Sequence, residues 1–284
     1  MRTSRNTLTV AQPLRYLGAA VLTLLLFGAL YVFFVLSSAG QLVDQLSYDG
    51  AENGWRSVTP FTRRLLDSVP AVSVVVGLAL TVVISLVRRN GVTLLVALGA
   101  AFAALLSSQL LKHALLTRPD LGVDGYASNS FPSGHTTVAA AAVLVVFLVA
   151  SPRTRPVVAA AGTGFAVVAG VATLANQWHR PSDVVAALLL VSFWGCVAGA
   201  VLSLRRASGP RVRPGRGRAA TRWLLVFVVL PAGAVAGVAL LVSVLRASAD
   251  SPAMLVAYVG GVAGIVAMGT MLALAGTRLF ARLP

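Results

Sequence analysis

Residues 178–204 read WHRPSDVVAALLLVSFWGCVAGAVLSL. The run from Val184 to Leu204 holds 21 residues without a charge, which is long enough to cross the hydrocarbon core of a bilayer as a helix. Polar residues crowd directly before this run, and Pro181 suits the first position of a helix. The stretch therefore predicts a membrane-spanning helix whose first turn carries reactive side chains.

The rest of the chain has the same apolar character. Of its 284 residues, 57% are hydrophobic and 11% are charged, and the mean hydropathy is +0.86. A soluble domain of this size does not carry so much apolar surface, so we predict an all-α, polytopic helical bundle in a membrane. The eight expected spans are Leu14–Leu36, Val69–Val87, Val92–Leu116, Thr136–Ala150, Val157–Ala175, Val184–Leu204, Trp223–Leu245 and Ala253–Leu274.

The spans divide into two groups. We expect a six-span core over residues 1–204, an Arg-, Gly- and Pro-rich linker over residues 205–221, and a two-span extension over residues 222–284. The first span follows a basic leader, but its length and the seven spans after it predict an uncleaved helix rather than a signal peptide. Ser37–Ser68 is predicted to be a long outer loop in which Trp55–Leu66 forms an amphipathic segment on the membrane surface.

The charge distribution predicts the topology. With the N-terminus in the cytoplasm, sixteen of the 23 basic residues fall on the inner side and all eight acidic residues on the outer side. This is the positive-inside pattern of a multi-pass protein of the cell membrane, with both termini cytoplasmic. We therefore attribute the net charge of +15 to the orientation of the protein in the membrane and to contact with membrane lipids. We expect no nucleic-acid partner.

Three polar clusters stand where apolar helices begin or end, and this topology places all three on the outer side of the membrane. They hold the only lysine of the chain and two of its three histidines. Side chains so rare in this sequence, gathered on one face, indicate a site that handles phosphate. The clusters are Lys112 with Arg118, then Ser133-Gly134-His135, then His179 with Asp183.

The second cluster has the features of an oxyanion site at a helix start. Ser133 is a good N-cap, and Gly134 lets a ligand approach the backbone closely. The free N–H groups of a first helical turn favour an anion, and His135 lies in that turn. The alternative interpretation is a plain serine cap followed by an interfacial histidine.

The third cluster can form a carboxylate–imidazole pair. Asp183 falls in the first turn of its helix, from which its carboxylate can reach back to His179. A carboxylate on one imidazole nitrogen makes the other nitrogen a better base or nucleophile. The alternative is that Asp183 only caps the helix and interacts with its dipole.

The first cluster supplies positive charge. Lys112 and Arg118 lie at and just beyond the end of the third span, where the alternative for Lys112 is snorkelling to lipid headgroups. We interpret His113 as an interfacial bystander. Because the His, Cys and Glu residues lack metal-ligand spacing and no nucleotide loop occurs, we predict no metal and no cofactor.

In their order the three clusters resemble the motifs of the type 2 phosphatidic acid phosphatase superfamily, although five residues separate Lys112 from Arg118 where six are usual. The resemblance covers about Leu14–Leu204 and implies a six-helix phosphatase-like core, with two further transmembrane helices after it. The sequence departs from the family at Ala172 and Thr173, where Ser-Arg is usual, and Arg180 is the nearest substitute for the missing arginine.

The resemblance implies a membrane phosphatase that acts on a lipid phosphate or pyrophosphate, such as polyprenyl pyrophosphate or phosphatidic acid, through a phosphohistidine. Two other functions stay open: a lipid phosphotransferase that uses the same histidine, and a non-catalytic protein that binds or transports lipid phosphate. The implied roles are nucleophile for His179, its partner for Asp183, acid and base for His135, and phosphate binding for Lys112, Arg118, Ser133 and Gly134.

Overall fold

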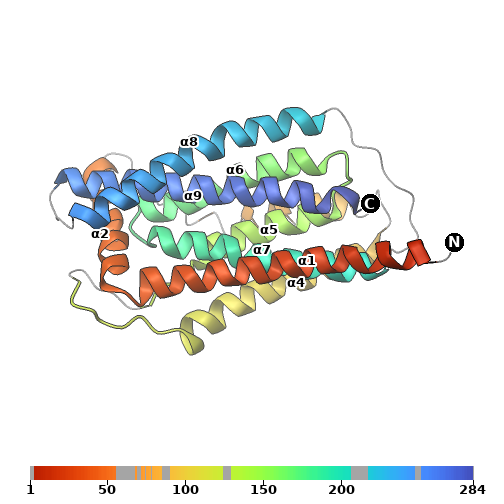
Figure 1. Ribbon diagram of the computed structural model, residues 1–284, viewed down its shortest axis with the longest axis horizontal. Coiled ribbons are helices and arrows are strands. Elements are labelled where there is room, and N and C mark those ends of the chain that lie inside the picture. Colours follow the sequence, from red (N-terminus) through yellow and green to blue (C-terminus); the bar gives the residue numbers. More distant parts are fainter. Residues whose placement is uncertain are drawn as a thin grey trace.

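The computed structural model describes residues 3–55, 68, 72–73, 75–77, 79–84, 90–123, 129–205, 217–246 and 251–283. These residues form helices and connecting loops without a strand, which confirms the all-α prediction. Most of the helices run roughly along one axis, whereas α2 crosses one end of the bundle (Figure 1). The helices labelled there are α1 (Thr3–Leu30), α2 (Ser38–Trp55), α4 (Gly91–Leu110), α5 (Gly134–Val149), α6 (Arg155–Ala175), α7 (Pro181–Arg205), α8 (Gly217–Arg246) and α9 (Ser251–Leu279).

The helix lengths fit a multi-pass membrane protein. Within the described part of the chain, six helical stretches are long and apolar enough to cross a membrane. They are Gln12–Val35, Gly91–Leu115, Arg155–Ala175, Pro181–Arg205, Arg222–Arg246 and Pro252–Leu279. The fourth expected span is the 16-residue helix α5, and the second, Val69–Val87, lies partly outside the described residues. The amphipathic segment Trp55–Leu66 and most of the linker 205–221 also lie outside them.

The helix predicted from residues 184–204 is the centre of the bundle. α7 is the most buried of the spans and lies against α1, α4, α5 and α9. Two glycines on it permit this close packing: a Cβ at Gly195 would lie 2.9 Å from Leu144, and one at Gly199 would overlap the ring of Tyr16. Its first turn is thereby fixed relative to the neighbouring helices.

The two C-terminal helices pack onto the rest of the bundle. α9 lies against α2, α6 and α7, and α8 covers α9. Arg155 at the start of α6 is buried and donates hydrogen bonds to the carbonyl oxygens of Phe280 and Leu283, at 3.0 and 2.6 Å. Arg155 therefore links the start of α6 to the segment that follows α9.

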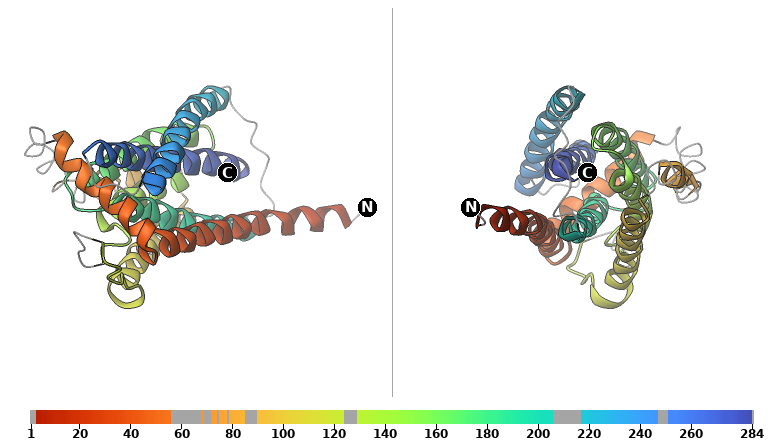
Figure 2. Two further views of the ribbon diagram at one scale, coloured as in Figure 1. Left: turned by 60° about the vertical axis from the view of Figure 1, so that its left-hand side comes forward. Right: turned by 90° about the vertical axis from the view of Figure 1, so that its right-hand side faces the viewer.

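The helix α2 is a feature that the sequence prediction missed. We expected a loop over Ser37–Ser68, but Ser38–Trp55 form an 18-residue helix at the end of the bundle opposite the two termini (Figure 2). Hydropathy does not reveal this helix because several of its buried residues are polar, including Gln41, Asp44 and Gln45. These side chains face the loops that carry the predicted site.

Candidate active site

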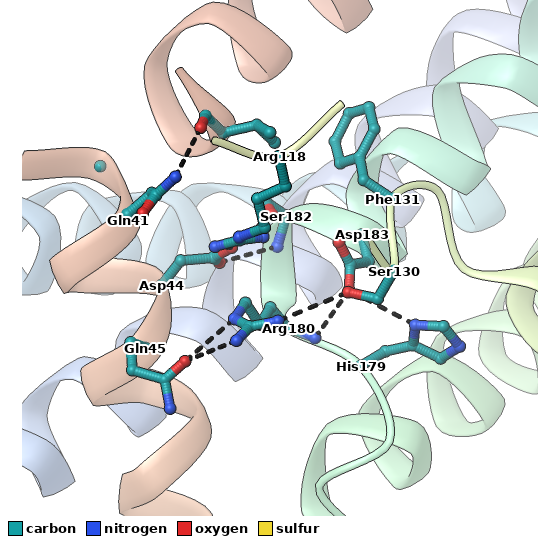
Figure 3. Close-up of polar contacts among 12 residues, drawn as sticks. Gln41, Asp44, Gln45, Arg118, Ser130, Phe131, His179, Arg180, Ser182 and Asp183 are labelled. Carbon is teal, nitrogen blue, oxygen red and sulfur yellow. Dashed lines mark hydrogen bonds and ion pairs between the residues drawn. The ribbon is translucent and has the colours of Figure 1, made fainter. Parts of the chain in front are cut away.

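The predicted nucleophile and its carboxylate are in contact. His179 Nδ1 lies 3.3 Å from Asp183 Oδ2, and the Asp183 side chain is fully buried. The same oxygen accepts hydrogen bonds from the Ser130 hydroxyl at 2.6 Å and from the backbone N–H of Arg180 at 3.0 Å (Figure 3). A carboxylate so placed favours the tautomer with the proton on Nδ1, which leaves the lone pair on Nε2.

The third cluster touches the second through the backbone and through the two histidines. The Ser133 N–H donates to the backbone carbonyl of Asp183 at 2.9 Å. The rings of His135 and His179 have centroids 6.2 Å apart, and Trp178 packs beside His135 at 5.1 Å. The first turn of α5 and the segment just before α7 therefore present both predicted catalytic histidines to the same space.

Local sequence explains how α5 begins at this point. The Ser133 side chain accepts the N–H of Thr136 at 3.3 Å, which is the predicted N-cap bond. A Cβ at Gly134 would meet only the Gln109 side chain, at 3.8 Å. Packing within the chain therefore does not require glycine at position 134, and this position leaves the backbone open to a ligand.

The first cluster lies at the end of the third span. Lys112 sits in a π-helical turn, Leu111–Leu115, whose backbone is tied to the loop before α5 by Asn129, which donates to the Lys112 carbonyl at 3.1 Å. Lys112 is half-buried and close enough to Asp183 for the opposite charges to attract.

Arg118 is buried in the loop that follows. Its Nη2 lies 3.8 Å from Asp44 Oδ2 on α2, and its side chain is 2% exposed. Gln41, one turn earlier on α2, donates to the Pro119 carbonyl at 2.8 Å. The position of this predicted phosphate ligand is thus set by α2.

Thr173 occupies the place of the missing arginine. It is fully buried, and its hydroxyl donates to the carbonyl of Gly170 at 2.7 Å within the same helix. Its own carbonyl accepts the N–H groups of Trp178 at 2.9 Å and of His179 at 3.3 Å. Thr173 therefore shapes the turn that leads to His179 and brings no charge to it.

Arg180 turns inward and is 3% exposed. Its Nη2 and Nε donate to Gln45 Oε1 at 2.7 and 3.1 Å, and its Nη1 lies 3.5 Å from Ser130 Oγ. The guanidinium thus lies beside the hydroxyl that donates to Asp183 Oδ2, the carboxylate oxygen that faces His179 Nδ1. That Arg180 replaces the missing arginine stays a prediction.

Sequence reasoning missed Ser130, which donates to Asp183, and the polar residues on α2. Asp44 accepts two hydrogen bonds from Ser182, from its N–H at 3.1 Å and from its hydroxyl at 2.5 Å. Gln45 accepts from Arg180 as described. A signal for them is present in the sequence, because the polar residues Gln41, Asp44, Gln45 and Tyr48 follow the spacing of one face of a helix.

Burial raises the pKa of Asp44 to about 7, and the nearby charge of Asp183 acts in the same direction. The pKa in the fold lies above the ordinary value of 3.8. Folding is therefore favoured most while Asp44 is protonated, below about pH 4, and this contribution is lost as the pH rises through 7. Asparagine at this position resembles the protonated acid.

We therefore expect the difference in unfolding temperature between Asp44→Asn and the parental protein to increase in favour of the variant as the pH rises from 5 to 8. The measurement is the unfolding temperature of both proteins in detergent at the two pH values. Asp120→Asn, at an exposed carboxylate, is the control and should show no such trend. A difference between variant and parent that shrinks toward pH 8 would contradict the prediction.

Comparison with known families gives one result. Residues 29–208, more than half of the chain, match the family model described as the PAP2 superfamily. The matched region contains all three polar clusters and α2. No curated protein and no solved structure matches the chain.

Proposed function

Because the chain belongs to the PAP2 superfamily, we propose that it is an integral-membrane phosphatase that hydrolyses a lipid phosphate or pyrophosphate without a metal ion. The observation that carries the proposal is the contact of His179 with Asp183 at the first turn of α7, with His135 beside it. It is the arrangement that a nucleophilic histidine requires: one nitrogen held by a carboxylate, the other available.

The first chemical step transfers the phosphoryl group to the enzyme. Nε2 of His179 attacks phosphorus, and the bond from phosphorus to the leaving oxygen breaks as His135 gives that oxygen a proton. Asp183 stabilises the positive charge that develops on the imidazole, through Nδ1–H. The products of this step are the lipid alcohol, or the lipid monophosphate from a pyrophosphate, and a phosphohistidine.

The second step hydrolyses the phosphohistidine and regenerates the free enzyme. His135 takes a proton from a water molecule, whose oxygen forms a bond to phosphorus while the bond to Nε2 breaks. Orthophosphate leaves, and His179 regains its lone pair. In both steps Lys112 and Arg118 offset the charge on the transferring group, and the first N–H groups of α5, at Gly134 and His135, provide further donors.

The position of the site supports a lipid substrate. His179 lies just before α7, which is long and apolar enough to cross a membrane, and His135 lies in the first turn of α5, a shorter apolar helix. α7 begins beside α2, at the end of the bundle opposite the two termini (Figure 1). By the charge distribution, this end faces away from the cytoplasm at the cell membrane. A substrate with its phosphate at that surface and its tail in the bilayer reaches the histidines without leaving the membrane.

The test is release of inorganic phosphate by the detergent-purified protein in the presence of EDTA. The substrates are polyprenyl pyrophosphate, phosphatidic acid and diacylglycerol pyrophosphate. We expect release from at least one of them, unchanged by EDTA. Phosphate that appears on an added lipid alcohol instead of in solution would identify a transferase, and binding without turnover would identify a binding protein.

A further inference from the structure

One side of α2 faces the active-site loops. Gln41, Asp44, Gln45 and Tyr48 stand at positions i, i+3, i+4 and i+7 of this helix, and each contacts one or both of two segments of the site. Gln41 and Asp44 reach the loop that carries Arg118, while Asp44, Gln45 and Tyr48 reach the segment that leads into α7. A single helix therefore joins the two loops that carry the arginines of the site (Figure 3).

Asp44 connects Arg118 with the start of α7. Its carboxylate holds both the N–H and the hydroxyl of Ser182, the residue directly before Asp183, and lies 3.8 Å from Arg118 Nη2. A buried carboxylate is strongly disfavoured unless it is paired and hydrogen-bonded, so these contacts restrain both partners. The guanidinium and the first turn of α7 are thereby fixed to one point on α2.

Gln45 and Tyr48 hold Arg180. The Gln45 carbonyl oxygen accepts two N–H groups of the guanidinium, and the Tyr48 ring lies under it with its centroid 5.3 Å from Cζ. The Gln45 amide is itself oriented, because its nitrogen donates to Asp49 Oδ1 at 2.8 Å. Arg180 Nη1 is thus kept 3.5 Å from Ser130 Oγ, which donates to Asp183.

We propose that α2 is a positioning element of the active site, in which Asp44 orients Arg118 for phosphate binding and Gln45 holds Arg180 in place beside Ser130 and Asp183. Neither residue touches the substrate in this proposal, which rests on the proposed function. In the proposal, the positive charge of the missing arginine is supplied by Arg180, which acts on Asp183 through Ser130. Arg118 acts on the phosphate.

The C-terminal extension supports this helix from behind. α9 packs along α2 so closely that a Cβ at Gly50 would overlap the carbonyl of Met254, and one at Gly261 would overlap Ser47. Long arginine side chains lose much rotamer freedom when they are fixed, and a rigid support lowers that cost at the moment of substrate binding. The last two helices thus contribute to the site by holding α2 against its loops.

The first test distinguishes the effect of the hydrogen-bond acceptor on Gln45 from the effect of the size of its side chain. Gln45→Met keeps the length and removes the acceptor, and we expect kcat to fall about tenfold with little change in KM, as for loss of a hydrogen bond to a charged group. The double variant Gln45→Glu/Asp49→Asn restores an acceptor for Arg180 and exchanges donor and acceptor in the second bond. It should recover most of kcat. Gln12→Met, in the N-terminal part of α1 and outside the contacts of the site, is the matched control.

Unchanged kcat in Gln45→Met would overturn the role of Gln45. An equal loss in Gln45→Met and in the double variant would also overturn it, since the loss would then not depend on an acceptor for Arg180. Unfolding temperatures of all variants are measured beside the kinetics. If Gln45→Met does not fold, the double variant still decides, because its recovery requires an acceptor at this position.

The second test uses the ionisation of Asp44, whose pKa burial raises to about 7. The charged groups that face this carboxylate are Arg118, Arg180 and Asp183. Since asparagine resembles the protonated acid, Asp44→Asn should raise KM about tenfold at pH 8, where the parental carboxylate is ionised and holds Arg118, and much less at pH 6. Asp120→Asn, in the loop of Arg118, is the control.

A KM that falls in Asp44→Asn would overturn the proposal, because Asp44 would then compete with phosphate for Arg118. A ratio of variant to parental KM that does not depend on pH would do the same. The proposed function fails separately, if the parental protein releases no phosphate. In that case the affinity for a non-hydrolysable lipid phosphonate, measured in the same variants, still tests whether α2 orients Arg118.

Discussion

Replacement of His179 by alanine is expected to lower the rate of phosphate release by a factor of about 10⁴ or more, as loss of a catalytic nucleophile does in other enzymes. The reason is that the reaction needs a lone pair beside phosphorus, and the Nε2 atom of His179 is the one that the site offers. Its Nδ1 faces Asp183 at 3.3 Å, so the imidazole is already oriented before substrate binds. Measured quantities are kcat from phosphate release and the incorporation of radiolabelled phosphate into protein.

The chain offers a matched control in His113, which is exposed on the turn that carries Lys112. His113→Ala changes the same residue type at the same end of the bundle and should retain the parental kcat. Retained turnover in His179→Ala, within about tenfold of the parental rate, would exclude this histidine as nucleophile, since a loss so small corresponds to a single lost contact. Labelled protein in the variant would exclude it as well.

Asp183→Asn is expected to lower kcat about 10⁴-fold while leaving the fold intact, as the same change does in a Ser-His-Asp triad. The amide has the shape of the carboxylate and can still accept from Ser130 and from the Arg180 N–H, so the first turn of α7 keeps its contacts. It lacks the negative charge that stabilises the imidazole as its bond to phosphorus forms. The side chain is fully buried, so water does not compensate for that charge.

The experiment measures steady-state kcat and the rate of formation of the phosphorylated protein, at matched unfolding temperatures. We expect formation of the phosphohistidine to slow by the same factor as kcat. Asp120→Asn, which removes an exposed carboxylate, should leave both rates unchanged. A kcat within about tenfold of the parental value would show that Asp183 only caps the helix, as the alternative interpretation of the sequence holds.

The sequence by itself determined the class of the protein and the local form of its polar clusters. Apolar runs as long as Val184–Leu204 cannot be exposed to water, so they predict spanning helices without knowledge of their neighbours. The Ser133 cap and the contact of His179 with Asp183 are equally local, because they join residues three or four positions apart. Such contacts follow from helix geometry alone.

Only the tertiary structure decided which distant groups surround these clusters. Asp44 and Gln45 are far in sequence from Ser182 and Arg180, and they lie in a segment too polar for hydropathy to mark as a buried helix. Whether Arg180 faces lipid, water or the site depends on an acceptor on α2, and α2 in turn is held by α9. The physical reason is that a buried charge must find its partners, and a sequence shows the charge without showing what the fold places beside it.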